Sequence, residues 1–243
     1  MKPTLSVVIL TRQANSALGR HLNILGVADE VIIVSDQIPK KGTLPKKVKI
    51  YHHPLSNNFS SQRNYALKLA TSDWVLFLDD DEKPSSDLLK EIPKVLDQKI
   101  DGFRIKRLDI FYNQVLQHGE TGKTKLIRLA QKNAGTWHRP VHEYWKIDGK
   151  IVDLKSSLYH FRHNLTAGFI SRIGHYSILD APALFKEGKP FSFFRLIFLP
   201  LAKFIRNYFF YLGFLDGFLG LFHAYLMSVQ SLTVRVFQWE KSL

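Results

Sequence analysis

The chain has 243 residues, a length that suits one sizeable domain with appendages and excludes two large domains. Apolar residues make up 45% and charged residues 23%, with 18 Phe and 9 Tyr, which supplies a packed core and excludes intrinsic disorder. The sequence contains no cysteine, so a disulfide framework, a thiolate zinc site and a cysteine nucleophile are all excluded.

The net charge is +13, from 34 basic and 21 acidic side chains, and it indicates a polyanionic partner such as nucleic acid, an anionic membrane surface or a phosphorylated small molecule. The excess is uneven along the chain. Residues 1–98 carry 13 basic and 11 acidic side chains, residues 99–150 carry 11 and 5, and residues 151–243 carry 10 and 5. No nucleic-acid-binding motif accompanies this charge, so its distribution favours an anionic glycolipid and a membrane surface over nucleic acid.

Short β-branched runs alternate with amphipathic stretches through the first hundred residues. We expect strands at 5–10, 31–34, 48–51 and 74–78, and helices at 16–25, 59–70 and 85–96. This alternation predicts an α/β fold in which a mainly parallel sheet is flanked by helices. The apolar run at 5–10 is too short for a secretory signal, so we interpret it as the first strand of a cytoplasmic protein.

Ligands of such sheets bind at the carboxyl ends of the strands. Thr11 and Arg12 follow the first expected strand, and Ser35 and Asp36 follow the second. Residues 79–82 follow the fourth. We therefore expect a ligand site at this edge, with Thr11 and Arg12 positioned to contact the ligand.

The strongest local signal is Asp79-Asp80-Asp81-Glu82, directly after an apolar run. Four neighbouring carboxylates repel one another unless a divalent cation or a cationic ligand compensates them. Their hard oxygens suit Mg²⁺ or Mn²⁺, ions that usually keep positions open for phosphate oxygens. A solvated acidic turn that caps the next helix is the alternative interpretation.

The remainder of the chain changes character twice. Strand-like pieces at 102–109, 125–129, 151–154 and 157–161 predict an antiparallel extension, and residues 165–186 suit a helix. Beyond Phe191 the chain is dense in Phe, Leu and Tyr, and the 28 residues between Arg206 and Arg235 carry one charged side chain, Asp216.

That apolar stretch exceeds the about 20 residues that a bilayer span needs. Glycines and Asp216 interrupt it, however, and a central Asp costs roughly 2.5–3.5 kcal/mol on insertion. Basic residues lie among the aromatic ones just before it. We therefore favour helices that lie in an anionic membrane interface, or that pack on each other as in a homo-oligomer.

The block from Phe59 to Glu82 contains Gln62-Arg63-Asn64 and, from Asp73, Asp-Trp-Val-Leu-Phe-Leu-Asp-Asp-Asp-Glu. It resembles the central block of family 2 glycosyltransferases, in particular bacterial enzymes of lipopolysaccharide core assembly. The likeness continues to His142-Glu143 and to residues 213–217. It implies a nucleotide-sugar-binding GT-A fold over residues 1–163, followed by a helical, membrane-associating or oligomerising region over residues 164–243.

The resemblance also implies an activity. The enzyme would move a sugar from a nucleotide-sugar, with a UDP-sugar as the expected donor, to a hydroxyl of a lipopolysaccharide-core or lipid-linked glycan. The reaction would be inverting and dependent on Mg²⁺ or Mn²⁺, because a divalent ion neutralises the nucleotide diphosphate that leaves. We expect the enzyme at the inner face of the cytoplasmic membrane, as a peripheral protein.

By the same resemblance, Asp81 is the principal metal ligand, and Asp79 contacts the ribose or the metal. His160 is a further candidate for the metal or the diphosphate. Asp36 lies one residue beyond Ser35, which matches the position of the family's nucleotide-reading Asp. A turn acid and a structural strand histidine are the alternatives for Asp36 and His160.

Arg63 and Asn64 line the donor site in this family, where Arg63 could meet the diphosphate as a planar fork. An inverting transfer also needs a base for the acceptor hydroxyl, and the resemblance makes Glu143 that base, with His142 orienting it or contacting the acceptor. A surface arginine paired with an acid, and a capping acid beside a packed histidine, are the alternative interpretations.

Two other functions stay open. A nucleotidyltransferase on a related α/β sheet would join a sugar phosphate to a nucleotide, although residues 10–17 contain no Gly-rich phosphate loop. A basic nucleic-acid-binding protein is the third reading, and it lacks a supporting motif.

Overall fold

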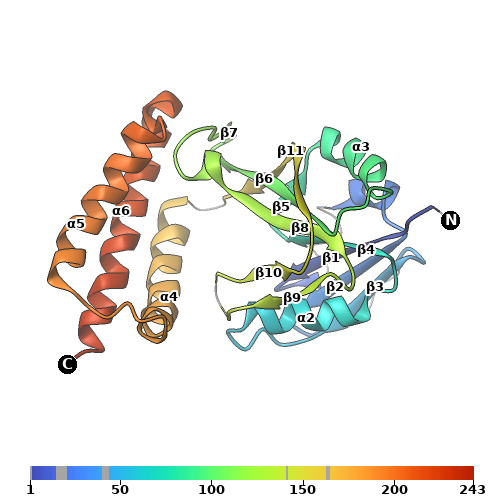
Figure 1. Ribbon diagram of the computed structural model, residues 1–243, viewed down its shortest axis with the longest axis horizontal. Helices are drawn as coiled ribbons and strands as arrows, with labels where there is room; N and C mark the ends of the chain where they lie inside the picture. The colour runs from blue at the N-terminus through green and yellow to red at the C-terminus, as the bar shows by residue number, and fades with distance from the viewer. Residues whose placement is uncertain (1, 15–20, 40–43, 141, 163–164) are drawn as a thin grey trace. The chain divides into compact units, whose positions relative to one another are not determined.

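The computed structural model describes residues 2–14, 21–39, 44–140, 142–162 and 165–243 (Figure 1). These residues form two compact units. The first comprises the chain up to residue 107 together with residues 125–160, and the second comprises residues 108–124 and 161–243. Residues 108–124, which the sequence places in the first region, thus belong with the C-terminal helices.

The first unit is built on a sheet with the order β3-β2-β1-β4-β8-β6-β11-β5. Its parallel half consists of β3 (Val48–His52), β2 (Glu30–Ser35), β1 (Leu5–Thr11) and β4 (Trp74–Asp79). In the other half, β8 (Lys125–Gln131) is antiparallel to both β4 and β6 (Gly102–Phe111), and β11 (Ile151–Phe161) is antiparallel to β5 (Glu82–Pro84).

The expected α/β fold with flanking helices is therefore confirmed, and the antiparallel extension follows the parallel strands as the sequence indicates. Two details differ. The strand pieces expected at 151–154 and 157–161 form the single strand β11. Within the expected helix 16–25, residues 15–20 lie outside the described residues, and Leu22–Gly26 forms a 3₁₀ helix, η1.

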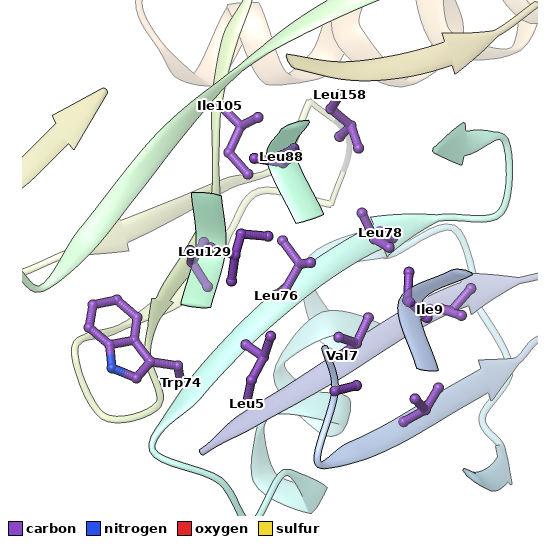
Figure 2. Packing of buried hydrophobic residues seen from close by; sticks show 14 of the residues in the cluster. Leu5, Val7, Ile9, Trp74, Leu76, Leu78, Leu88, Ile105, Leu129 and Leu158 are labelled. Atoms are coloured by element: carbon purple, nitrogen blue, oxygen red, sulfur yellow. The ribbon is translucent and has the colours of Figure 1, made fainter. Parts of the chain in front are cut away.

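Strands β1, β2 and β4 are buried on both faces, and their alternate side chains point to opposite sides of the sheet. On one face, β1 and β4 pack against α3 (Ser86–Val95), and Figure 2 shows Leu5, Val7, Ile9, Leu76 and Leu78 in one hydrophobic cluster with Leu88. On the other face, Val8, Leu10 and Phe77 pack against Ala66 of α2 (Phe59–Leu69). The two helices thus cover opposite faces of the sheet (Figure 1).

Side-chain caps fix where both helices begin. The Asn58 side chain accepts a hydrogen bond from the Ser61 backbone N–H at the start of α2. The Ser85 hydroxyl accepts one from the Leu88 N–H at the start of α3, and Asp87 lies in the first turn, where a negative charge favours the helix dipole. These caps hold the two helices in register with the strand ends.

A hairpin that the sequence did not predict lies on the α2 side of the sheet. It consists of β9 (Gly135–His138) and β10 (Tyr144–Ile147). Its two inward tryptophans, Trp137 and Trp145, stack with ring centroids 5.2 Å apart, and each packs edge-on against Phe77 at 5.1 Å. This cluster fixes the hairpin to β4, whose last residue is Asp79.

The second unit contains the remaining helices. The described part of this unit has β7 (Gln114–Val115), η2 (Thr121–Lys123), α4 (Leu165–Lys186), α5 (Phe193–Ile205), the π-helical turn η3 (Arg206–Phe210), η4 (Gly213–Asp216) and α6 (Gly217–Glu240). Helix α4 has the bounds that the sequence predicts. Helices α5 and α6 lie side by side (Figure 1).

Asp216, the acid that interrupts the apolar stretch, is buried and bound by the loop after β7. Its carboxylate accepts hydrogen bonds from the backbone N–H groups of Gln117 at 3.3 Å and His118 at 2.8 Å, and lies 2.9 Å from His118 Nδ1. Gly220 has no room for a side chain, because a Cβ there would collide with the carbonyl of Gly213. Both residues are required by packing within this unit.

Candidate active site

The carboxyl ends of β1, β2 and β4 meet at one edge of the sheet. Thr11 pairs with Ser35 across β1 and β2, and Leu10 pairs with Asp79 across β1 and β4. The sequence-predicted edge therefore forms as expected, and it carries the turn of residues 79–82, called here the acidic turn.

The first acid of the acidic turn is held between two arginines. Asp79 Oδ1 accepts a hydrogen bond from Arg63 Nη2 at 2.7 Å, and Oδ2 accepts one from Arg128 Nη2 at 2.6 Å. Burial disfavours the charged form of Asp79, yet the charges of Arg128 and Arg63 outweigh it and hold the pKa of this carboxyl well below its usual range. Asp79 is therefore a carboxylate with both oxygens engaged.

The middle acids of the acidic turn face two other strand ends. Asp80 Oδ2 accepts a hydrogen bond from Thr11 Oγ1 at 2.8 Å. Asp81 Oδ2 lies 3.1 Å from Nε2 of His160, which β11 delivers because His160 is paired with Glu82 of β5. The structure thus brings together Asp81 and His160, two of the three predicted metal ligands.

The last acid, Glu82, is fully buried. Its Oε1 accepts hydrogen bonds from Arg128 at 2.9 Å and from Arg107 at 3.4 Å, and its Oε2 accepts one from the Asp79 backbone N–H at 3.1 Å. The charges of Asp79 and Glu82 raise the pKa of Arg128 above its usual range, although burial acts in the opposite direction. Three arginines therefore supply much of the compensation that the sequence led us to expect from a divalent cation or a cationic ligand.

Arg63 links the acidic turn to the loop before β10. Its side chain is 1% exposed, and its guanidinium lies 4.6 Å from the ring centroid of Trp137. Nε and Nη2 donate hydrogen bonds to Glu143 Oε1 at 3.0 and 2.8 Å, in addition to the bond from Nη2 to Asp79. The sequence suggested contact with a diphosphate, whereas the structure gives this guanidinium two carboxylate partners.

Glu143 lies at the end of a strained loop, and 15% of its side chain is exposed. Arg139 and His142, in the same loop, have φ angles of 70° and 51°, in the left-handed region that non-glycine residues rarely adopt. His142 is itself exposed. The loop thus directs Glu143 inward to Arg63, while His142 is exposed to solvent.

Three further predicted residues occupy distinct places. The Asn64 side chain pairs with the backbone of Trp137 through two hydrogen bonds of 2.9 Å, so it holds the hairpin in place. The Asp36 carboxylate accepts a hydrogen bond from the Leu55 N–H at 2.7 Å, and Arg12 is exposed at the strand edge.

Sequence reasoning did not place Arg128 or Arg107 at the acidic turn, and it did not predict the burial of Glu82. One signal was available for Arg128, which interrupts the otherwise apolar run Leu126-Ile-Arg-Leu-Ala130 of an expected strand. A charge in such a run indicates a buried partner of opposite sign.

A divalent cation requires hard ligands with open coordination positions. The described residues contain no group of three or more His, Asp or Glu side chains that could hold a metal ion by themselves. The carboxylate of Asp81 offers a hard oxygen ligand of the kind that Mn²⁺ or Mg²⁺ prefers, and the imidazole of His160 lies beside it.

Comparison with known proteins supplies the family. Residues 6–144 match the model of glycosyl transferase family 2. An uncharacterized glycosyltransferase of Rickettsia typhi is 30% identical over 240 residues, which cover 88% of this chain and 80% of that protein. The lipopolysaccharide core biosynthesis glycosyltransferase LpsC of Rhizobium meliloti is 24% identical over 250 residues, which cover 94% of this chain and 92% of LpsC.

Among solved structures, the chain is similar to residues 1–349 of S. aureus TarS, with a TM-score of 0.49 and 16% identity over 99% of this chain and 92% of that one. The same TarS fragment in complex with UDP-GlcNAc matches with a TM-score of 0.47 and 19% identity. That match covers 66% of this chain and 59% of the TarS chain.

Proposed function

Since this chain belongs to glycosyl transferase family 2 and is a glycosyltransferase, we propose that it transfers a sugar from a nucleotide-sugar donor to a hydroxyl of a lipopolysaccharide-core or lipid-linked glycan, with inversion at the anomeric carbon. One observation carries this proposal. A candidate base, Glu143, and the acidic turn are held by the same buried guanidinium, that of Arg63.

In the proposed reaction, the acceptor oxygen forms a bond to the anomeric carbon as the bond from that carbon to the nucleotide diphosphate breaks. Glu143 takes the proton of the acceptor hydroxyl, and the diphosphate leaves with the electron pair of the broken bond. Arg63 holds Glu143 in place through two hydrogen bonds. His142, exposed beside Glu143, would contact the acceptor or orient the base.

A divalent cation fits the other end of the acidic turn. Asp81 and His160 would hold Mn²⁺ or Mg²⁺ with the donor diphosphate, and the bound ion would neutralise charge on the leaving group. Both oxygens of Asp79 are engaged by arginines, so we assign Asp79 to the frame of the site. Thr11, Arg12 and Asp36 would contact the nucleotide from the strand edge.

The catalytic role belongs to residues 1–163 and membrane association to residues 164–243. Within the described residues, one segment, Gly213–Glu240, is long and apolar enough to cross a membrane. Its first acid, Asp216, is bound by the polar loop at Gln117 and His118, which favours a helix that lies along a membrane over one that crosses it.

The surface of the second unit supports this peripheral role. Large apolar side chains are exposed along α5, η3, η4 and α6, with Phe210 and Phe218 each 76% exposed. Arg195, Lys203 and Arg206 lie among them in the sequence, and Lys203 and Arg206 also pair with Glu120. Exposed aromatic residues beside basic ones suit the anionic inner leaflet, where a lipid-linked acceptor would be presented. The enzyme would then work in the cytoplasm at the inner face of the membrane.

The donor assignment is tested by thermal unfolding with a panel of UDP-, GDP-, ADP- and CMP-sugars in the presence of Mn²⁺. A donor that binds the native state raises the unfolding midpoint by mass action. We expect a UDP-sugar to give the largest rise and chelator to abolish it. The donor assignment fails if no nucleotide-sugar shifts the midpoint.

A further inference from the structure

We propose that Arg128 is a positioning residue of the transferase site, which fixes both ends of the acidic turn and so presents Asp80 and Asp81 to the donor diphosphate and its cation. The inference rests on the proposed function for its ligand. Arg128 lies on β8, 46 positions from Glu82 in the sequence, and is not among the site residues that the sequence predicts.

A single nitrogen of Arg128 joins the first and the last acid of the acidic turn. Nη2 donates to Asp79 Oδ2 at 2.6 Å and to Glu82 Oε1 at 2.9 Å. Glu82 Oε2 in turn accepts a hydrogen bond from the Asp79 backbone N–H at 3.1 Å. The first and last residues of this four-residue turn are therefore joined both through a cation and through the backbone, which fixes the path of the chain between them.

Burial makes this cation hard to replace. The side chains of Arg128 and Glu82 are 5% and 0% exposed, so removing the guanidinium would leave a carboxylate in the interior without its closest counter-charge. Arg107 also reaches Glu82, but at 3.4 Å. Repulsion between Asp79 and Glu82 would then open the turn.

Arg128 acts through the turn on the two acids between its ends. Asp80 is directed to Thr11 of β1, and Asp81 is directed to His160 of β11. Neither of these acids is a partner of Arg128 in the contacts described above. An opened turn would move Asp81 away from His160 and so separate the two groups that would share the cation.

The two arginines that bind Asp79 differ in which of their nitrogens donate hydrogen bonds. Arg63 spans Glu143 and Asp79 with Nε and Nη2, a task for a planar fork. Arg128 makes both of its bonds with Nη2, and its buried Nε has no hydrogen-bond partner. One ammonium nitrogen at the same point could serve Asp79 and Glu82, so lysine should replace Arg128. At position 63, lysine would lose the additional hydrogen bond that Nε makes to Glu143.

The test compares Arg128→Lys and Arg128→Met with the wild-type chain. Binding of UDP with MnCl₂ is measured by isothermal titration calorimetry, and unfolding midpoints report folding. We expect Arg128→Met to weaken binding by about tenfold or more, the scale on which residues that orient metal ligands act, and Arg128→Lys to stay within about threefold of wild type. Lys49→Met is the matched control, because Lys49 bonds Glu30 through one nitrogen on β3.

If Arg128→Met does not fold, the double variant Arg128→Met/Glu82→Gln takes its place, because it removes one buried cation together with one buried anion. A folded methionine variant that binds UDP and Mn²⁺ like wild type would overturn the proposal, as would a lysine variant as weak as the methionine variant. Loss of folding in the double variant as well would mean that Arg128 serves folding alone, and would also overturn it.

Hydrogen–deuterium exchange separates this inference from the proposed function. If the wild-type chain binds neither UDP nor Mn²⁺, the donor assignment fails, and exchange in the peptide of residues 77–84 then decides the role of Arg128. Faster exchange there in the methionine variant, restored by lysine and absent in Lys49→Met, supports positioning. Unchanged exchange overturns it.

Discussion

Arg63 donates two hydrogen bonds to one oxygen of Glu143, from Nε at 3.0 Å and from Nη2 at 2.8 Å. The same Nη2 lies 2.7 Å from Asp79. The proposed base and the first acid of the acidic turn therefore share one guanidinium. A change that moves Arg63 should alter proton transfer and donor binding together.

Replacing Arg63 by lysine tests this sharing. Lysine would lose the hydrogen bond from Nε to Glu143 and the planar fork that holds this carboxylate, so we expect Arg63→Lys to lower kcat by about 100-fold, a loss of roughly 2.7 kcal/mol in transition-state stabilisation. Steady-state kinetics and the unfolding midpoint are the measurements. A folded lysine variant with nearly wild-type kcat would contradict the shared role.

Glu143→Gln tests the base directly. The amide has the shape of the carboxylate but cannot take the acceptor proton, so turnover should fall by about 10²–10⁴-fold. Affinity for the nucleotide, measured by calorimetry, should change little, because Glu143 is assigned to the acceptor side. If affinity and turnover fall in parallel, Glu143 serves the donor site instead.

Asp81→Asn tests the cation site. Asparagine keeps a neutral oxygen ligand and removes the charge, so we expect affinity for Mn²⁺ in the presence of UDP to fall by at least about tenfold. Asp87→Asn, in the exposed first turn of α3, is the control. Chelator should reproduce the effect in wild type, and added Mn²⁺ should reverse it. Equal affinity in the two variants would rule out Asp81 as a ligand.

Membrane association is tested with Phe210→Glu/Phe218→Glu. Each exposed ring contributes about 1.5–3 kcal/mol if it becomes fully buried in lipid, so the pair should reduce binding to vesicles of phosphatidylethanolamine and phosphatidylglycerol by at least about tenfold. Ile38→Glu is the control, because Ile38 is equally exposed but lies in the first unit. Co-sedimentation of the double variant at wild-type levels would contradict a lipid-facing role.

The buried side chain of His223 should make the free energy of unfolding depend on pH. Burial lowers the pKa of His223 to about 4, and the neighbouring charges of Asp109 and Arg162 act in opposite directions. The unfolded chain takes up this proton near pH 6.5, so the free energy of unfolding should fall as the pH drops from 6.5 toward 4, by about 2 kcal/mol at pH 5.

Urea unfolding of the wild-type chain and of His223→Gln at pH 7 and pH 5 measures this contribution. The glutamine variant does not titrate in this range, so its free energy of unfolding should change less between the two pH values. The same change in both proteins would show that other groups cause the acid sensitivity.

The parallel half of the fold was predictable because β-branched runs and helical periodicity alternate without interruption. The resemblance to family 2 glycosyltransferases is confirmed by the match over residues 6–144. The β9–β10 hairpin was not predictable in the same way, since its strands have four residues each and its inward positions, Trp137 and Trp145, are stabilised by Phe77 of a distant strand.

The candidate site, like the fold, was predictable from the sequence only in part. Local sequence placed Asp79 and Asp81 at a strand end, because an apolar run there stops abruptly at acids. The partners of these acids come from β8, β11 and α2, and pairing across such distances leaves no local pattern. Arg128 stands out in the sequence as a charge in an apolar run, but the acids that it compensates became visible only with the sheet order in hand.

The pairing of His160 with Glu82 has a consequence for the order in which the enzyme matures. Strand β5 has three residues, and β11 must align with it in one register, because a shift by one position would turn the imidazole to the opposite face. A nascent chain that ends before residue 160 carries the acidic turn without this imidazole. The chain would therefore bind the cation through both Asp81 and His160 only after β11 has joined the sheet. The parallel half of the fold would form first, and activity would begin later.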